Sequence, residues 1–389
     1  MILALLAALY GLIAGALAAA VLWLMDQVSH LVWSGPDTAV YIFATIMVGG
    51  VLIALLRCIY DGQDLAGQLA EFRAPDVRAR REAALMASMA IVAVGFGGAI
   101  GPEAGILAVA EELSLLVSIR IARTNAARAE LIRESIAAGA LGGLYASPPA
   151  GAMAAQTPGE APKWQLYLAA LTGLFGFVFT LKQFLPERAL RISLPGYPDP
   201  GDGLDMILAI LPAVLGAVIG LLFLTMLPVL KTLLGKCGGL AVQTLIGTLL
   251  FAGLAAALPI LRFSGHHEFP ELLSFGAQSG ALALFGLAAL KVLALAICLA
   301  AGWRGGAAFP LLFAGAAAGG SAVWMLPAIP ETAAIIAGMT AALTAGLGKP
   351  IAAMLIAFLI VGNPAAGPLL IGAAIGWAAS RLVPHSNMH

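Results

Sequence analysis

Two short Gly- and Pro-containing motifs carry the residues of this sequence that are best suited to chemistry. The first reads Gly97-Gly98-Ala99-Ile100-Gly101-Pro102-Glu103, and the second reads Gly305-Gly306-Ala307-Ala308-Phe309-Pro310-Leu311. Each precedes a long apolar segment, so each is expected to be a loop that leads into a helix with a proline in its first turn. Glycines leave the N–H groups of such a loop accessible, and a helix N-terminus carries partial positive charge. The two motifs therefore predict an anion site at two helix starts.

Glu103 is the ionisable residue that such a site would use. A charged residue at membrane depth costs ~3 kcal/mol on insertion scales, so its presence needs a reason. The N–H groups of a first helical turn favour a carboxylate, which a competing anion could displace and which could leave when protonated. Displacement by an anion or departure on protonation would open the site, and Glu103 would then be a gate. The alternative is an ordinary first-turn acid at a water interface, and the residues alone leave both interpretations open.

Three further ionisable groups stand in apolar segments, and their roles stay open. Glu111 and Glu112 follow Glu103 on the same predicted helix, but at about 100° per residue they cannot both face one path with it. We expect them to contact a neighbouring helix or water. Lys291 either adds positive potential to an anion path or has a structural role, by snorkelling or pairing.

The sequence contains no motif that indicates an enzyme or a metal site. His266-His267-Glu268 lies in a short connection, and adjacent histidines seldom chelate one metal together, so a solvated loop is favoured. Walker loops, nucleophile elbows and zinc motifs are missing from the sequence. We therefore expect no catalytic residue, metal or cofactor. A formal net charge of zero gives no indication of a nucleic-acid partner.

The composition indicates an all-α integral membrane protein. The chain is 61% hydrophobic and 10% charged, whereas soluble domains carry about 25% charged residues. The apolar runs are long and lack the two-residue alternation of a barrel. The 46 glycines and 22 prolines favour broken helices that cross only part of the bilayer. The predicted apolar segments are 2–33, 38–60, 83–100, 103–122, 134–157, 164–181, 205–230, 238–262, 276–302, 307–326, 332–347, 349–362 and 366–383.

A polar, Pro-rich break near the middle of the chain predicts three regions. These are an N-terminal membrane repeat over 1–184, a linker over 185–204 and a C-terminal membrane repeat over 205–389. A second pair of motifs supports the duplication: Ala146-Ser147-Pro148-Pro149-Ala150-Gly151 follows the first Gly-rich motif much as Gly348-Lys349-Pro350-Ile351-Ala352-Ala353 follows the second.

The distribution of arginines predicts the topology. Five of them lie between Arg57 and Glu82, which places this connection in the cytoplasm by the positive-inside rule. Two apolar segments precede it, so the N-terminus is expected in the cytoplasm as well. The predicted location is a multi-pass position in a bacterial-type inner (plasma) membrane.

The motifs resemble those of a known family in their order and spacing. Gly101-Pro102-Glu103-Ala104-Gly105 is similar to a Gly-Lys/Arg-Glu-Gly-Pro gate motif, and Gly305 to Pro310 is similar to Gly-Gly-x-Phe-x-Pro. The stretch from Ala146 to Gly151 resembles Asn-Ala-Pro-Leu-Ala-Gly. These are motifs of the CLC family of chloride channels and proton-coupled chloride antiporters, and the likeness covers about residues 5 to 383.

The resemblance implies a homodimer in a lipid bilayer, with a separate pore in each subunit. Each subunit would be an inverted repeat of many tilted, partly re-entrant helices. The substrate implied is chloride or another small anion, together with protons in an antiporter, and Glu103 would be the gate. The anion-binding residues implied are Gly101, Pro102, Ala104, Gly105, Gly306, Ala307, Ala308, Phe309 and Pro310.

Several positions depart from the family pattern. Where a serine ligand is expected, the chain reads Tyr60-Asp61-Gly62-Gln63-Asp64, and Leu370 stands at the position of a coordinating tyrosine. The inner proton-transfer glutamate aligns with Thr157-Pro158, and Glu160 lies close by. Backbone amides then remain as the main anion donors. The alternatives are a transporter of fluoride or another halide and a transport-inactive membrane interaction protein, with an intramembrane enzyme a distant third.

Overall fold

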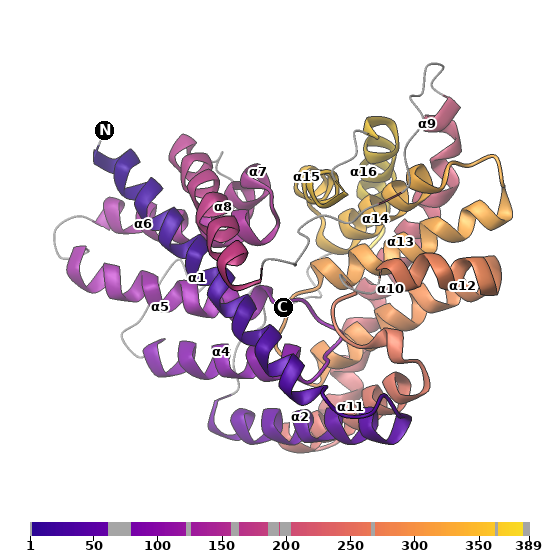
Figure 1. The fold of residues 1–389 in the computed structure, drawn as a ribbon, viewed down its shortest axis with the longest axis horizontal. Helices are drawn as coiled ribbons and strands as arrows, with labels where there is room; N and C mark the ends of the chain where they lie inside the picture. The colour runs from indigo at the N-terminus through magenta and orange to yellow at the C-terminus, as the bar shows by residue number, and fades with distance from the viewer. Residues whose placement is uncertain are drawn as a thin grey trace.

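The computed structural model is built from α-helices and one short 3-10 helix in the residues that it describes (Figure 1). These residues are 2–60, 79–121, 126–156, 163–185, 194, 204–265, 269–361 and 365–383. The helices are α1 (Ile2–Val32), α2 (Ala39–Ile59), α4 (Ala79–Gly95), α5 (Glu103–Ile121), α6 (Ala126–Leu144), α7 (Pro148–Ala155), α8 (Trp164–Phe184), α9 (Leu204–Leu208), α10 (Ile210–Gly235), α11 (Leu240–Ala257), η1 (Pro259–Leu261), α12 (Phe269–Ala300), α13 (Ala308–Met325), α14 (Glu331–Leu347), α15 (Pro350–Val361) and α16 (Ala366–Ser380).

Helix length and composition confirm the prediction of an all-α integral membrane protein. In the described part of the chain, seven helices are long and apolar enough to cross a membrane. Four apolar helices are shorter, among them α14, α15 and α16. Such short helices agree with the expectation of segments that cross only part of the bilayer.

Several predicted apolar segments are divided where the backbone turns. The segment 134–157 contains α6 and α7, because Ala146 adopts a left-handed φ of 49° and Pro148 then begins a new helix. The segment 238–262 contains α11 and η1. The segment 276–302 belongs to α12, which begins at Phe269 and is interrupted at Gly280, where φ is 77°.

The two halves of the chain contain helix groups that pack in the same order. In the first half α1, α6 and α8 contact one another, and in the second half α10, α14 and α16 do so. The crossings use small residues: Gly15 of α1 lies against Gly173 of α8, and Gly216 of α10 lies against Gly338 of α14. Small residues let the backbones approach closely, which is how helices associate in lipid.

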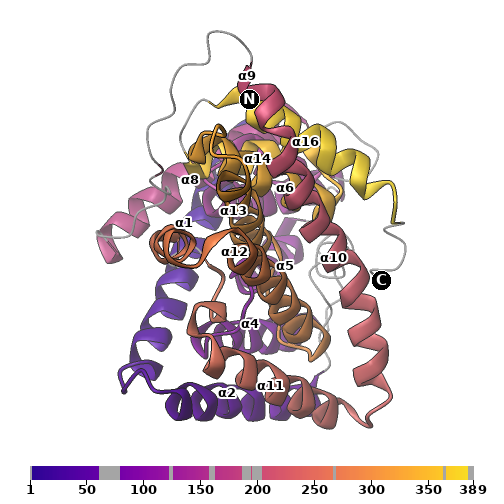
Figure 2. The ribbon, with the colours of Figure 1, turned by 90° about the vertical axis from the view of Figure 1, so that its right-hand side faces the viewer.

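The halves lie side by side and meet through matching elements. Figure 1 shows the N-terminal helices on the left and the C-terminal helices on the right, with α2 and α11 together at the bottom of both views (Figures 1 and 2). The helix α7 also contacts α15. The domain boundaries at 184 and 205 stay a prediction, because most of the linker lies outside the described residues.

A matched pair of glycine substitutions tests the small-residue packing. A Cβ added at Gly15 would overlap the carbonyl of Gly173, whereas a Cβ at Gly253 of α11 meets nothing within 4 Å. We expect Gly15→Ala to destabilise the fold by about 1–3 kcal/mol, the usual effect of overpacking. Gly253→Ala is the control and should leave stability unchanged or slightly higher. Thermal unfolding of the detergent-solubilised protein measures both. Equal melting temperatures for the two variants would contradict the packing described here.

Candidate functional site

The first Gly-rich motif forms a tight loop between α4 and α5. Gly97 has a φ of 82°, and a side chain there would run into the indole of Trp33. The Trp33 Nε1–H donates to the carbonyl of Gly95 at 3.0 Å, which fixes the indole over the loop. The chain then passes Pro102 and starts α5 at Glu103. The predicted loop and helix start are therefore present, with Pro102 immediately before the helix.

The second motif forms the corresponding loop between α12 and α13. Gly302 has a φ of 85° and lies against the guanidinium of Arg57, which donates to the carbonyl of Ala301 at 3.0 Å. The helix α13 starts at Ala308 with Pro310 in its first turn, and its N-cap Ala307 provides no side-chain cap. The N–H groups of the first turn are thus not capped by the side chain of Ala307.

A reciprocal pair of hydrogen bonds joins the two loops. The N–H of Gly101 donates to the carbonyl of Gly306 at 2.8 Å, and the N–H of Gly306 donates to the carbonyl of Gly101 at 3.0 Å. This antiparallel bridge is the single isolated one among the described residues. It brings the starts of α5 and α13 together.

The carboxylate of Glu103 lies against this bridge and is fully buried. A Cβ added at Gly101 or at Gly306 would overlap the carboxylate, so a side chain at either position would displace it. The N–H groups of Gly306, Ala308 and Phe309 act on the carboxylate electrostatically. In the described part of the chain neither carboxylate oxygen has a hydrogen-bond partner with good geometry. The structure thus brings Glu103 together with the first turn of α13.

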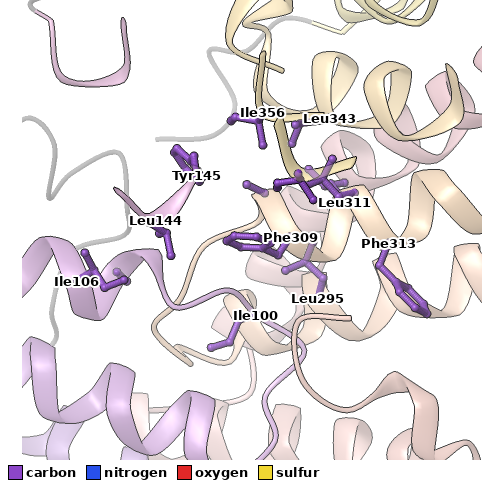
Figure 3. Packing of buried hydrophobic residues seen from close by; sticks show 14 of the residues in the cluster. Ile100, Ile106, Leu144, Tyr145, Leu295, Phe309, Leu311, Phe313, Leu343 and Ile356 are labelled. Atoms are coloured by element: carbon purple, nitrogen blue, oxygen red, sulfur yellow. The ribbon is translucent and has the colours of Figure 1, made fainter. Parts of the chain in front are cut away.

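Tyr145 and Phe309 form the aromatic boundary of the site. Their ring centroids are 6.2 Å apart with an interplanar angle of 42°, and both side chains are buried. Figure 3 shows Leu144 and Tyr145 from the end of α6 facing Phe309 and Leu311 of α13, with Ile100 of the first loop nearby. The sequence reasoning missed Tyr145, although it immediately precedes the motif at 146–151.

Comparisons with known proteins place the chain in a family. The model of the family described as voltage gated chloride channel matches residues 63–381. The chain belongs to this family, the CLC family. It is 27% identical over 247 residues to the Escherichia coli protein named "Putative ion-transport protein YfeO", in an alignment that covers 62% of this chain and 57% of that relative. The aligned part therefore spans less than two thirds of the relative's length.

Two solved structures have a similar fold. One is described as a CLC-type fluoride/proton antiporter, with a TM-score of 0.76 and 18% sequence identity over 98% of this chain and 95% of that one. The other is described as a slow cyanobacterial Cl⁻/H⁺ antiporter, with a TM-score of 0.76 and 18% identity over 99% of this chain and 95% of that one. The predicted CLC-type fold class is confirmed.

The other residues predicted for an anion site in this CLC chain lie in different surroundings. Gly105 lies against the side chain of Met25 of α1, and its predicted part in anion binding stays a prediction. Pro102 and Pro310 have no N–H and shape the helix starts. Leu370, which the resemblance aligns with a coordinating tyrosine, is 52% exposed on α16.

The remaining acidic candidates are not part of the described site. Glu112 is half-buried on α5, and nothing is described for the side chain of Glu111. Asp61, Asp64, Glu160 and the His266-His267-Glu268 sequence lie outside the described residues. No described group of three or more His, Cys, Asp or Glu residues is placed to hold a metal ion.

Lys291 lies behind the segment that contacts the first loop. It is fully buried on α12. Its Nζ lies 3.3, 3.2, 2.9 and 2.9 Å from the four consecutive carbonyl oxygens of residues 260–263, which share its three N–H donors. Phe263, at the end of this run, has a φ of 57°, and its N–H donates to the carbonyl of Gly97 at 3.0 Å. Lys291 therefore fixes the segment that holds the first Gly-rich loop, which is a structural role.

Removal of the Lys291 ammonium should destabilise the protein. We expect Lys291→Met to lower stability by about 1–3 kcal/mol or more, because it leaves buried carbonyls without a donor. Lys182→Met changes an exposed lysine of α8 in the same way and should have little effect. Thermal unfolding in detergent compares the two. An unchanged melting temperature for Lys291→Met would show that the carbonyls do not depend on this donor.

Proposed function

We propose that this chain passes chloride or a similar small anion across a membrane and that the carboxylate of Glu103 is its gate. The observation that supports this proposal is the position of Glu103. Its carboxylate is buried between two paired helix starts and lacks a well-formed hydrogen bond within the described residues.

The surroundings of the Glu103 carboxylate would also suit a small anion. Burying an ionised carboxylate without hydrogen bonds is unfavourable, while the helix starts favour negative charge. A carboxylate held there mainly by partial charges can be replaced by a small anion that uses the same N–H groups. Protonation would remove the negative charge of the carboxyl group. The N–H groups would then attract it less, and it could leave the site. The anion and the ionised carboxylate would then compete for one position, and proton binding would favour the anion.

The proposal extends to assembly and location. The face of α8 that carries Leu171, Phe175 and Phe179 exposes these side chains, so it needs lipid or a second subunit to cover it. We propose a homodimer in a bacterial-type inner membrane, with the N-terminus in the cytoplasm. No enzymatic activity and no cofactor are part of the proposal.

Fluoride is the second candidate substrate. One of the two similar structures is described as a fluoride/proton antiporter, and its TM-score equals that of the chloride/proton antiporter. The serine and tyrosine ligands expected for chloride are also missing from their positions in the sequence. Efflux of chloride and fluoride from the same vesicles compares the two substrates.

Replacement of Glu103 tests the gate. We expect Glu103→Ala to raise chloride efflux from proteoliposomes by about tenfold, which corresponds to ~1.4 kcal/mol in the barrier, because the carboxylate no longer occupies the site. The matched control is Glu331→Gln. Glu331 is likewise a first-turn glutamate, but it is exposed at the start of α14. An ion-selective electrode records the efflux. Equal efflux from wild type and Glu103→Ala would refute the gate.

A neutral replacement tests the link to protons. Glu103→Gln cannot lose or gain a proton, so its efflux should not change with pH. Wild-type efflux should rise as the pH falls, because protonation withdraws the competing negative charge. Efflux measured at several pH values, with equal pH on both sides of the membrane, checks this. A pH dependence that Glu103→Gln retains would place the proton-sensitive group elsewhere.

A further inference from the structure

Tyr145 is a buried tyrosine beside the proposed gate. It is 8% exposed and follows the last residue of α6. Its ring packs on Phe309, whose N–H belongs to the first turn of α13. It also interacts electrostatically with the carboxylate of Glu103. Tyr145 therefore borders the space in which an anion would replace that carboxylate.

The hydroxyl of Tyr145 makes no hydrogen bond to any residue that the structure describes. Phe would provide the same ring contact with Phe309. The hydroxyl is thus a polar group beside the site that the ring contact does not require.

The backbone around Tyr145 is fixed in an unusual conformation. Ala146 has a φ of 49°, which is unfavourable for a residue with a Cβ. The turn is closed by hydrogen bonds from the N–H of Ala146 to Gly143 at 3.1 Å and from the N–H of Ser147 to Gly142 at 3.0 Å. The Ser147 hydroxyl then caps α7 by accepting from the N–H of Ala150 at 3.3 Å. This turn holds Tyr145 in place, and strain of this kind is often found at functional sites.

We propose that the Tyr145 hydroxyl donates a hydrogen bond to a small inorganic anion bound beside Glu103, and that it is a specificity-determining residue of the site. This inference rests on the proposed function, since it needs an anion at that position. Tyr145 would supply a hydroxyl donor from the end of α6. The chain lacks a hydroxyl at the two positions where the resemblance implies one, the serine position and Leu370, which is exposed on α16.

The contribution of the Tyr145 hydroxyl to binding should depend on the size of the anion. A smaller anion brings its charge closer to the donor, so the electrostatic part of the hydrogen bond is larger for fluoride than for chloride. Loss of the hydroxyl should therefore weaken fluoride binding more than chloride binding. A purely structural role of Tyr145 would not change this ratio.

Anion-dependent thermal stability of the purified full chain tests the proposal. The melting temperature is measured in detergent against increasing sodium fluoride or sodium chloride, with sodium gluconate keeping the ionic strength constant. Wild type should be stabilised by either halide, because a ligand of the folded state raises its stability. Tyr145→Phe should need about tenfold more fluoride for the same stabilisation, as expected for loss of one hydrogen bond to a charged group. Its melting temperature without halide should equal that of wild type.

Two controls make each outcome decisive. Tyr167→Phe removes a hydroxyl from an exposed tyrosine of α8 and should leave the halide dependence unchanged. Glu103→Ala should bind halide more tightly, because the competing carboxylate is gone.

If wild type and Glu103→Ala respond to halide and Tyr145→Phe responds like wild type, the role of Tyr145 is wrong and the proposed function stands. If neither wild type nor Glu103→Ala responds, both are wrong. A lower melting temperature of Tyr145→Phe without halide would show that the hydroxyl is structural and would overturn the proposal.

Discussion

The paired hydrogen bonds between Gly101 and Gly306 are the constraint on which the site depends. They join two loops from opposite halves of the chain and so fix the starts of α5 and α13 relative to each other. The absence of a side chain on either residue leaves room for the Glu103 carboxylate, because a Cβ on either would occupy its space. A backbone contact thus determines where the one buried carboxylate of the site lies and which N–H groups surround it.

The rest of the molecule keeps these two loops in register. Lys291 holds residues 260–263, which in turn bind Gly97, and Arg57 lies against Gly302. Around them, helices pack through glycines and alanines, because lipid offers no hydrophobic driving force for their association and close backbone contact takes its place. Backbone contacts therefore hold both Gly-rich loops. A small increase in side-chain volume near the glycines should for this reason affect the site directly.

The sequence predicted the parts of this site that depend on local chemistry. Long apolar runs predicted most of the helices, and the Gly and Pro residues of the two motifs predicted two loops that lead into helices. The sequence could not place the end of α6, because an alanine at 146 gives no indication of a left-handed turn. It could not identify Tyr145 either, since its importance comes from Phe309, which is far away in the chain. Motif order alone also gave no information on which face of α16 Leu370 occupies, and its side chain is exposed.

The distribution of charge suits a site that exchanges its ligand. A permeation site must bind an ion well enough to admit it and weakly enough to release it. A lysine or arginine in direct contact with the anion would bind it tightly in a site of low dielectric constant. In this chain, the ammonium of Lys291 is directed to four carbonyls, and the guanidinium of Arg57 binds Ala301 and Thr244. Both buried cations thus stand behind the loops, and the carboxylate of Glu103 meets N–H groups that carry only partial charge. Under the proposed function, this separation of full and partial charges is what allows a small anion and the carboxylate to replace each other.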